Sequence, residues 1–221
     1  MSVRLPWAQI QTILLDMDGT LLDLRFDNHF WRELVPERYA DRHALSLEQA
    51  RAEVAARTRA VEGTMEWYCL DYWSRELALD IVMLKREIGH LIAVHPHVLE
   101  FLDALRAAGK RVVLVTNAHP QSLALKMEKT RLAERFDATV CAHALGSVKE
   151  QPGFWPGLRE VEPFDPATTL LVDDNLAILR AAHAFGIAYL VSVLRPDSAD
   201  PPKPPGEFFA IGDFSELLPV G

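Results

Sequence analysis

Short apolar runs recur along the chain, each three to five residues long, and several are rich in β-branched residues. They are residues 13–15, 112–115, 138–141, 169–172 and 189–193. Continuous apolar runs of this kind are typical of strands buried on both faces, as in a parallel sheet that helices cover. We therefore predict that these five runs are strands of one parallel sheet.

In the stretches between these runs, apolar residues recur at the spacing that is typical of helices. Residues 98–108 and 176–185 each end just before a glycine, which commonly stops a helix, and residues 121–134 show the same spacing. Strands and helices therefore alternate, a pattern that predicts an α/β fold with a doubly wound, Rossmann-like parallel sheet. The proline-dense stretch 195–207 predicts a loop.

Residues 23–95 break this alternation. The stretch has no β-branched run and is rich in Ala, Arg and Glu at helical spacing, and Ser46 with Gln49 has the pattern of a capping box. We expect a helical insertion that folds as a cap domain of its own. It would lie between the two parts of the α/β core domain, residues 1–22 and 96–221.

Composition narrows the classes of partner. The chain has 221 residues, and 23 Lys and Arg against 31 Asp and Glu give a net charge of −8, which argues against a nucleic-acid partner. No apolar run approaches the roughly 18 residues that a membrane span needs, so we expect no membrane partner. Cys69 and Cys141 lie far apart and fit a reducing compartment. We expect two small buried cysteines and a cytoplasmic location.

Two carboxylates follow the first apolar run directly. Asp16 and Asp18 are placed at the carboxyl end of the predicted strand, where ligands bind in open parallel sheets. Residues i and i+2 of an extended chain point the same way, and two carboxylates that close repel unless a divalent cation lies between them or one keeps its proton. An ordinary turn at Asp18-Gly19 also explains the pattern, so this motif alone leaves both readings open.

Polar side chains follow the other runs as well. Thr116 and Asn117 close the second run, Asp173 and Asp174 close the fourth, and Lys149 lies in the loop between the third and fourth. Each has an ordinary explanation as a turn residue, a helix cap or a surface lysine. Their shared position at strand ends nevertheless predicts that they gather at one site.

The chemistry that fits this set is phosphoryl transfer through an aspartyl-phosphate. We expect Asp16 to be the nucleophile, and Asp18 to protonate the leaving oxygen and then activate a water. Thr116 and the backbone near Asn117 would hold phosphoryl oxygens. Lys149 would balance the charge on the nucleophile and the phosphate, because a carboxylate cannot attack a phosphate dianion unless that charge is neutralised.

The carboxylates at the strand ends also predict a metal site. Oxygen-rich carboxylate sites suit Mg²⁺, which binds substrate phosphate directly. We expect Asp174, supported by Asp173, to complete a Mg²⁺ site together with the acids that follow the first run, Asp16 and Asp18.

These motifs resemble those of the haloacid dehalogenase-like (HAD) superfamily over nearly the whole chain. LLDMDGT, VTN, Lys149 and VDDN match its four motifs in order, and the helical insertion matches its C1 type of cap. In that family the second aspartate of the first motif marks phosphatases and mutases rather than dehalogenases. The resemblance also implies that Mg²⁺ contacts Asp16, the backbone carbonyl of Asp18, and Asp174. Relatives often follow the lysine directly with proline, whereas Glu150 follows it here, which bears on the geometry of that loop.

The segments FDNHFWRELVPE and WYCLDYWS are similar to those of the bacterial purine 5′-nucleotidases of this superfamily, which act on GMP and IMP. This resemblance implies a purine nucleoside monophosphate as the small-molecule substrate. The candidate contacts to it are Tyr68, Asp71, Tyr72 and Trp73, and His119 near the phosphate. Aromatic rings could stack a base, worth roughly 1–3 kcal/mol each, although rings at helical spacing more often form the core of a cap.

Two other functions compete with this one. A phosphomutase, or a phosphatase of another small phosphometabolite such as a sugar phosphate, would use the same residues. A signalling receiver module also uses acids, Thr and Lys on a doubly wound sheet. It lacks an insertion of about 70 residues after the first strand, and its phosphorylated Asp lies on a later strand, so the sequence argues against it.

Overall fold

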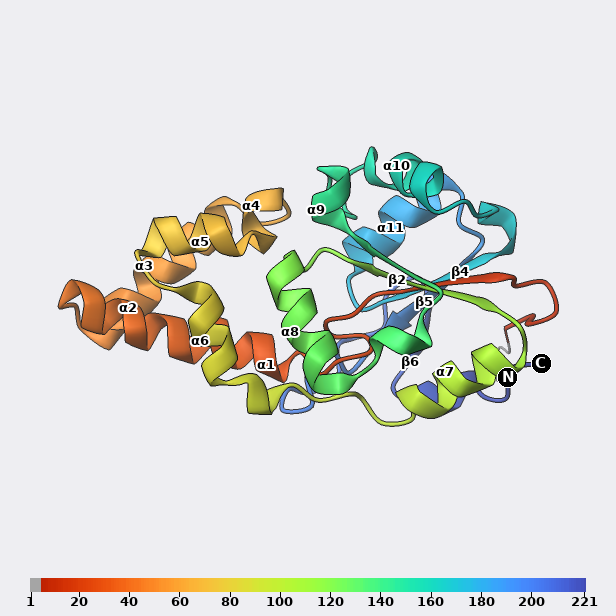
Figure 1. Cartoon of the computed structure of the whole chain (residues 1–221), viewed down its shortest axis with the longest axis horizontal. Coiled ribbons are helices and arrows are strands. Elements are labelled where there is room, and N and C mark those ends of the chain that lie inside the picture. Colours follow the sequence, from red (N-terminus) through yellow and green to blue (C-terminus); the bar gives the residue numbers. More distant parts are fainter. Residues whose placement is uncertain (1–4) are drawn as a thin grey trace.

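The computed structural model describes residues 5–221; residues 1–4 of the first expected core segment lie outside the described residues. Six parallel strands form one sheet in the order β3-β2-β1-β4-β5-β6 (Figure 1). The strands are Thr12–Leu15 (β1), Arg111–Thr116 (β2), Ala138–Cys141 (β3), Thr169–Asp173 (β4), Tyr189–Val193 (β5) and Phe209–Ile211 (β6). The first five confirm the runs predicted from the sequence.

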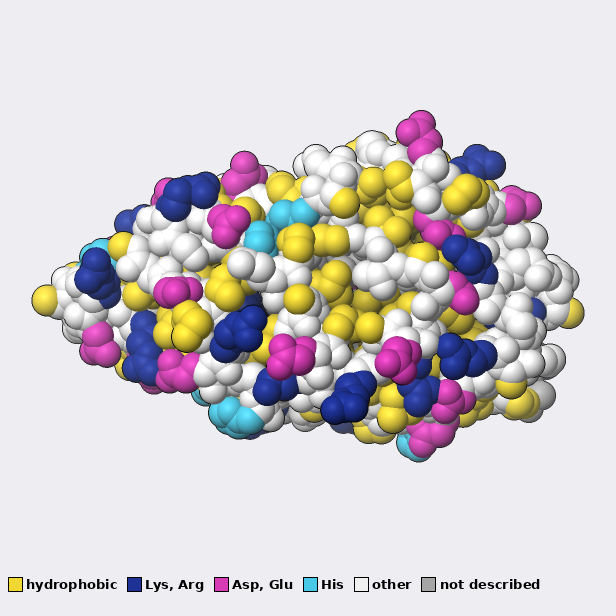
Figure 2. Space-filling model, in the orientation of Figure 1, with side chains coloured by type: hydrophobic (Ala, Val, Ile, Leu, Met, Phe, Trp, Pro, Cys, Tyr) yellow, Lys and Arg dark blue, Asp and Glu magenta, His cyan; other side chains and the backbone are white. Residues whose placement is uncertain are grey.

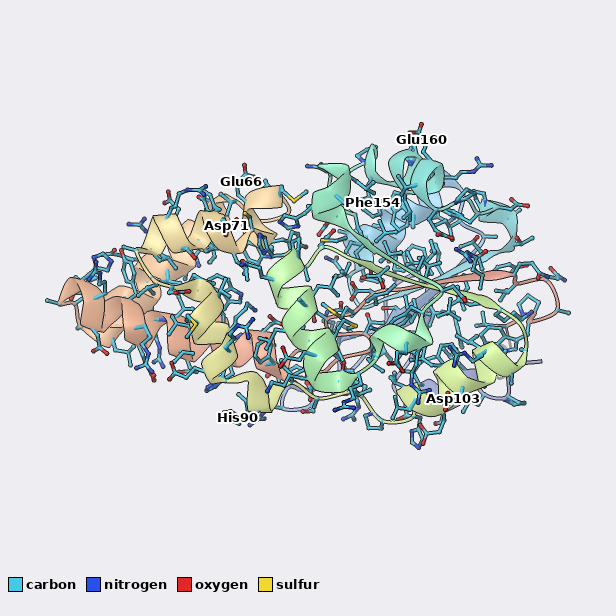
Figure 3. The ribbon with its side chains drawn as sticks, in the orientation of Figure 1. Glu66, Asp71, His90, Asp103, Phe154 and Glu160 are labelled. Atoms are coloured by element: carbon cyan, nitrogen blue, oxygen red, sulfur yellow. The ribbon has the colours of Figure 1, made fainter. Side chains whose placement is uncertain are left out.

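Helices cover both faces of this sheet. They are α7 (Val98–Ala107) and α8 (Pro120–Thr130) on one face, and α9 (Ala142–Leu145), α10 (Phe154–Val161) and α11 (Leu176–Phe185) on the other (Figure 1). Side chains of a strand alternate between faces, so Ile13 and Leu15 pack towards α7 while Leu14 packs towards α10 and α11. Phe154, the first residue of α10, is buried in the core on this face of the sheet (Figure 3). The doubly wound α/β fold is therefore confirmed.

Six further helices form a separate group beside the sheet, on the left in Figure 1. They are α1 (Arg25–His29), α2 (Val35–His43), α3 (Leu47–Ala60), α4 (Met65–Tyr68), α5 (Leu70–Leu77) and α6 (Ile81–Glu87), with a π-helical turn at Phe30–Leu34. We call residues 25–87 the helical layer. Its buried side chains form a cluster of their own, to which α8 adds Leu125. The predicted capping box begins α3, with Ser46 and Gln49 each bonded to the backbone N–H of the other.

Two crossings connect the helical layer to the sheet, and they lie side by side. The Asp23 N–H donates to the Ala93 carbonyl at 2.9 Å, and the His95 N–H donates to the Leu21 carbonyl at 2.9 Å. The chain therefore leaves the sheet and returns to it through two extended segments that are hydrogen-bonded to each other.

The structure corrects several details. β3 is an edge strand with half-exposed side chains, and is not buried on both faces. The helix expected over residues 121–134 ends at Thr130, because Arg131 takes the left-handed backbone conformation with φ 56°. The short strand β6 was not predicted from its three-residue run. Cys69 and Cys141 are only partly buried.

No helix within residues 5–221 is long and apolar enough to cross a membrane. The stretch 195–207 contains neither helix nor strand, as expected for a proline-dense loop.

Replacing Leu102 with Ala should lower the free energy of unfolding by about 2–5 kcal/mol, because this α7 side chain is 1% exposed and packs in the core. Leu99 lies on the same helix but is 41% exposed, so Leu99→Ala is a matched control that should cost less than about 0.5 kcal/mol. Urea unfolding followed by circular dichroism measures both. Equal losses would contradict this assignment of the buried face of α7.

Candidate active site

The carboxyl ends of neighbouring strands bring the predicted residues together. Asp16 follows β1, Thr116 ends β2 and Asp173 ends β4, and β1 pairs with both of the other strands. A cleft of about 550 Å³ opens over these ends. Its lining includes Asp16, Asp18, Thr116, Asn117, Lys149, Asp173 and Asp174, together with Trp67 and Tyr68 of α4 and Lys203.

Lys149 forms the centre of the buried charge. Its Nζ lies 2.6 Å from Asp16 Oδ1 and 2.7 Å from Asp173 Oδ2, and the residue is only 1% exposed. Burial opposes a charged ammonium, but the adjacent carboxylates of Asp16 and Asp173 outweigh it and raise the pKa of Lys149. Lys149 is therefore a fixed positive charge on the floor of the cleft.

Three carboxylates form a group that could hold a metal ion. One oxygen each of Asp16, Asp173 and Asp174 lies within 4.8 Å of the others. Burial raises the pKa of Asp16 to about 6 and that of Asp173 to about 6, despite the attraction of Lys149, and a neighbouring carboxylate adds to each shift. Lys203 donates to Asp174 Oδ2 at 2.8 Å. Three carboxylates thus face two ammonium groups. A divalent cation would relieve the repulsion that remains among the carboxylates.

Gly19 allows this group to form. Its φ of +82° suits glycine, and a Cβ atom added there would lie 2.8 Å from Asp174 Cγ. The turn after β1 therefore approaches the Asp174 carboxylate more closely than any other residue type would permit.

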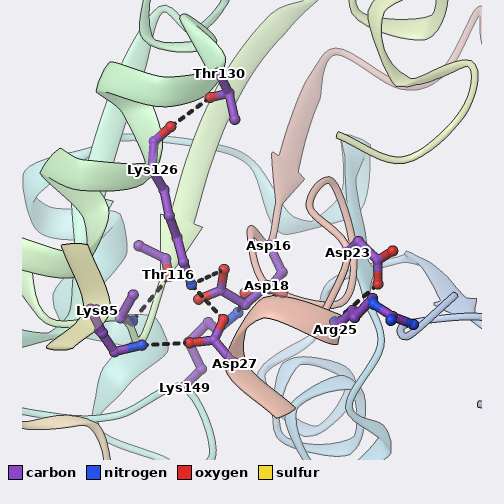
Figure 4. Close-up of polar contacts among 11 residues, drawn as sticks. Asp16, Asp18, Asp23, Arg25, Asp27, Lys85, Thr116, Lys126, Thr130 and Lys149 are labelled. Atoms are coloured by element: carbon purple, nitrogen blue, oxygen red, sulfur yellow. Dashed lines mark hydrogen bonds and ion pairs between the residues drawn. The ribbon is translucent and has the colours of Figure 1, made fainter. Parts of the chain in front are cut away.

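The carboxylate of Asp18 lines the same cleft and joins a chain of alternating charges (Figure 4). Lys126 Nζ donates to Asp18 Oδ1 and to Asp27 Oδ2, each at 2.6 Å, and Lys85 Nζ donates to Asp27 Oδ1 at 2.7 Å. Burial raises the pKa of Asp18 to about 6, although Lys126 opposes this shift. Asp18 is not part of the group formed by the Asp16, Asp173 and Asp174 carboxylates, and its own carboxylate is bonded to Lys126.

Asn117 fixes the loop that carries Lys149. Its side-chain oxygen accepts from the Lys149 N–H at 3.0 Å, and its amide nitrogen donates to Glu150 at 2.8 Å. The Tyr68 hydroxyl donates to the same Glu150 carboxylate at 2.6 Å. Glu150, which stands where relatives often have proline, thus links this loop to the helical layer and leaves Lys149 in place.

The structure places the five predicted substrate contacts in different surroundings. Tyr68 lines the cleft, and His119 lines an adjoining hollow of about 150 Å³. Trp73 is 1% exposed in the core of the helical layer, and Tyr72 packs edge-on against it with ring centroids 5.0 Å apart. Asp71 lies on α5 with a side chain that is 66% exposed and contacts His119 rather than the cleft (Figure 3). Neither Tyr72 nor Asp71 lines the described cleft, and Trp73 only borders a neighbouring hollow.

Sequence patterns gave no sign of several residues at the site. Lys126 and Asp27 are 99 residues apart, and Lys203 comes from the proline-dense loop. Such pairings depend on how distant elements pack, so no local motif reveals them. Trp67 does have a sequence signal, because it belongs to the aromatic stretch WYCLDYWS, although it is not among the predicted substrate contacts.

Comparisons with known proteins identify the family of this chain and similar folds. A family model described as "haloacid dehalogenase-like hydrolase" matches residues 10–186. The chain is 40% identical over 219 residues to the GMP/IMP nucleotidase YrfG of Escherichia coli (strain K12), covering 99% of both chains. It is 28% identical to a phosphoglycolate phosphatase of Nitrosospira multiformis over 80% of each chain. A HAD phosphatase from Thermococcus onnurineus, 22% identical, superposes with a TM-score of 0.78 over 94% of this chain and 96% of that one, a likeness of fold.

Replacing Lys126 with Met should lower the free energy of unfolding by about 3–5 kcal/mol, because Asp18 and Asp27 would be left buried without their shared cation. Lys129 lies one turn further along α8 and is exposed, so Lys129→Met should change stability by less than about 0.5 kcal/mol. Urea unfolding in the same buffer compares the two variants. A loss for Lys126→Met no larger than for Lys129→Met would show that the charge chain is not formed.

Proposed function

The chain belongs to the haloacid dehalogenase-like hydrolases, and on that premise we propose that it is a Mg²⁺-dependent phosphatase of purine nucleoside 5′-monophosphates such as IMP and GMP. The observation that carries the proposal is the buried pair of Asp16 and Lys149 on the floor of the cleft, 2.6 Å apart. The identity of 40% over nearly the whole chain to a GMP/IMP nucleotidase supports the substrate class.

Asp16 is the nucleophile of the proposed reaction. Its carboxylate oxygen forms a bond to phosphorus while the bond from phosphorus to the nucleoside oxygen breaks, and the leaving oxygen takes a proton from Asp18. Asp18, now ionised, accepts a proton from a water whose oxygen attacks the phosphorus of the aspartyl-phosphate. This step releases inorganic phosphate and restores the Asp16 carboxylate. The raised pKa of Asp18, about 6, suits a group that both gives and accepts a proton near neutral pH.

Charge on the phosphoryl group is balanced by several parts of the chain. The Lys149 ammonium and the Thr116 hydroxyl line the cleft beside Asp16 and would contact phosphoryl oxygens. The side chain of Asn117 is bonded to the backbone of Lys149 and to Glu150, so we assign it to positioning Lys149.

The buried carboxylates suit Mg²⁺, a cation that prefers oxygen ligands. Asp16 and Asp174 would hold it, with the backbone carbonyl of Asp18, and Asp173 would support the site through Lys149. Bound there, Mg²⁺ would neutralise phosphoryl charge and draw the phosphate towards Asp16.

The purine base would rest against α4. Trp67 and Tyr68 line the cleft above the carboxylates, and Trp67 with Asn28 also lines an adjoining hollow of about 450 Å³ within the helical layer. Residues 23–95 would thus act as a cap domain that supplies the base-binding wall, while residues 1–22 and 96–221 supply the phosphate chemistry.

A panel of phosphate esters tests the proposed activity. We expect Mg²⁺-dependent phosphate release from IMP and GMP to exceed that from AMP, UMP, glucose 6-phosphate and phosphoglycolate. Chelation with EDTA should abolish it, and Asp16→Asn should lower it at least about 1000-fold, as removal of a nucleophile does. Release from sugar phosphates or phosphoglycolate alone would contradict the purine assignment. Undiminished release by Asp16→Asn would contradict the mechanism.

Replacing Trp67 with Leu should raise the KM for IMP by about 5- to 150-fold, the equivalent of one lost base stack of roughly 1–3 kcal/mol. The inhibition constant of inorganic phosphate, which has no base, should stay within about twofold. Tyr72→Leu is the matched control, because this ring packs against Trp73 and does not line the described cleft. An unchanged KM, or an equal weakening of phosphate binding, would show that Trp67 does not contact the base.

A further inference from the structure

A second group of metal-ligating side chains lies outside the cleft, where the corner between α4 and α5 meets α8 and α9. Cys69 precedes α5, His119 precedes α8, and His143 lies in α9. One ligand atom of each lies within 4.8 Å of the others. Figure 2 shows histidine side chains gathered at the surface where the helical layer meets the sheet, so an ion could reach this place from solvent.

The histidine nitrogens in this group have few partners. His143 Nε2 is buried and has no hydrogen-bond partner, and its Nδ1 lies 3.8 Å from the sulfur of Cys141. The lone pair of His119 accepts only a long contact, 3.3 Å, from the Gln121 N–H. A buried imidazole nitrogen without a partner is costly unless something binds it.

The protonation of the group also suits a metal. Burial lowers the pKa of His119, against the attraction of Asp71, and burial lowers the pKa of His143 as well. Both shifts favour the neutral imidazole, which is the form that binds metals. The sulfur of Cys69 accepts from the Tyr72 N–H at 3.4 Å and keeps lone pairs free for a second partner.

We propose that Cys69, His119 and His143 form a binding site for Zn²⁺ or a similar transition-metal ion. Sulfur and imidazole ligands select such ions, whereas the oxygens beneath the cleft select Mg²⁺. Ligand atoms on a tetrahedral Zn²⁺ lie about 3.5 Å apart, so small side-chain rotations complete the site. Asp71 lies outside this group, but its Oδ2 is 3.7 Å from His119 Nε2, so its exposed side chain would turn towards the ion to supply the fourth ligand.

The ligands come from both parts of the molecule. Cys69 and Asp71 belong to the helical layer, whereas His119 precedes α8 and His143 lies in α9, two helices that pack on the sheet. A bound ion would therefore add a further link between the two parts, beyond the crossings at residues 21–23 and 93–95 and the contacts of Tyr68 with Glu150 and of Lys126 with Asp27. The site uses none of the proposed phosphate-transfer residues, so it is independent of the proposed function.

Co²⁺ serves as a visible probe of this site, with excess Mg²⁺ present to occupy the carboxylates. The wild-type protein should bind one Co²⁺ with the intense thiolate-to-metal absorption and the tetrahedral bands of a sulfur ligand, and Zn²⁺ should displace it. Cys69→Ser should abolish the thiolate absorption, and His143→Gln should weaken Co²⁺ binding at least about tenfold, a loss that even outer partners of a metal cause. Cys141→Ser is the matched control and should leave the spectrum unchanged.

Asp16→Asn provides the comparison with the carboxylate site and should bind Co²⁺ as the wild type does. The proposal is overturned if no thiolate absorption forms, if Cys69→Ser keeps it, or if binding is lost in Asp16→Asn but kept in His143→Gln. Circular dichroism checks that each variant is folded, and His143→Gln, on a short helix at the surface, tests the site even if Cys69→Ser does not fold.

Discussion

The position of one ammonium group determines much of this structure. Lys149 neutralises two buried carboxylates that the ends of β1 and β4 place next to each other, and without it their burial would be strongly unfavourable. Its loop lies outside the sheet, so other contacts must fix it. Asn117 holds the backbone N–H of Lys149, and the Trp155 indole donates to its carbonyl at 3.0 Å. Because Trp155 is itself fully buried, the packing on one face of the sheet fixes the charge in the cleft.

Asp18 is positioned by contacts from a different set of elements. Lys126 reaches it from α8, and the same ammonium holds Asp27 at the start of the helical layer. Lys85 in α6 bonds Asp27 from the other side and lies 4.6 Å from the ring centroid of Phe30. Asp18, the proposed acid and base, is thus bonded to a lysine that also contacts the helical layer. Asp16, the proposed nucleophile, is bonded to a lysine of the sheet part.

Local patterns predicted the features that depend on neighbours in sequence. The four runs that became β1, β2, β4 and β5 are apolar enough to be covered by helices, whereas the run that became β3 lies half exposed at the edge. The polar residues at the strand ends converged because parallel strands share one carboxyl edge. The pairs Lys126–Asp18 and Lys203–Asp174 were not predictable, because an isolated lysine looks the same whether its partner is water or a buried carboxylate. The aromatic stretch shows the same limit: Tyr68 and Trp73 share one stretch, yet one lines the cleft and the other is core, and only the packing of α4 against α5 separates them.

The paired crossings have a consequence for how such a chain can change over time. Leu21 and His95 are hydrogen-bonded neighbours although more than seventy positions separate them, so the sheet holds the two ends of the insertion as it would hold the ends of a tight turn. The entropic cost of closing a loop rises only slowly with its length. Holding these two ends together therefore costs little more free energy for a long insertion than for a short one. The helical segment can therefore be lengthened or shortened during evolution without displacing the strand ends that it joins.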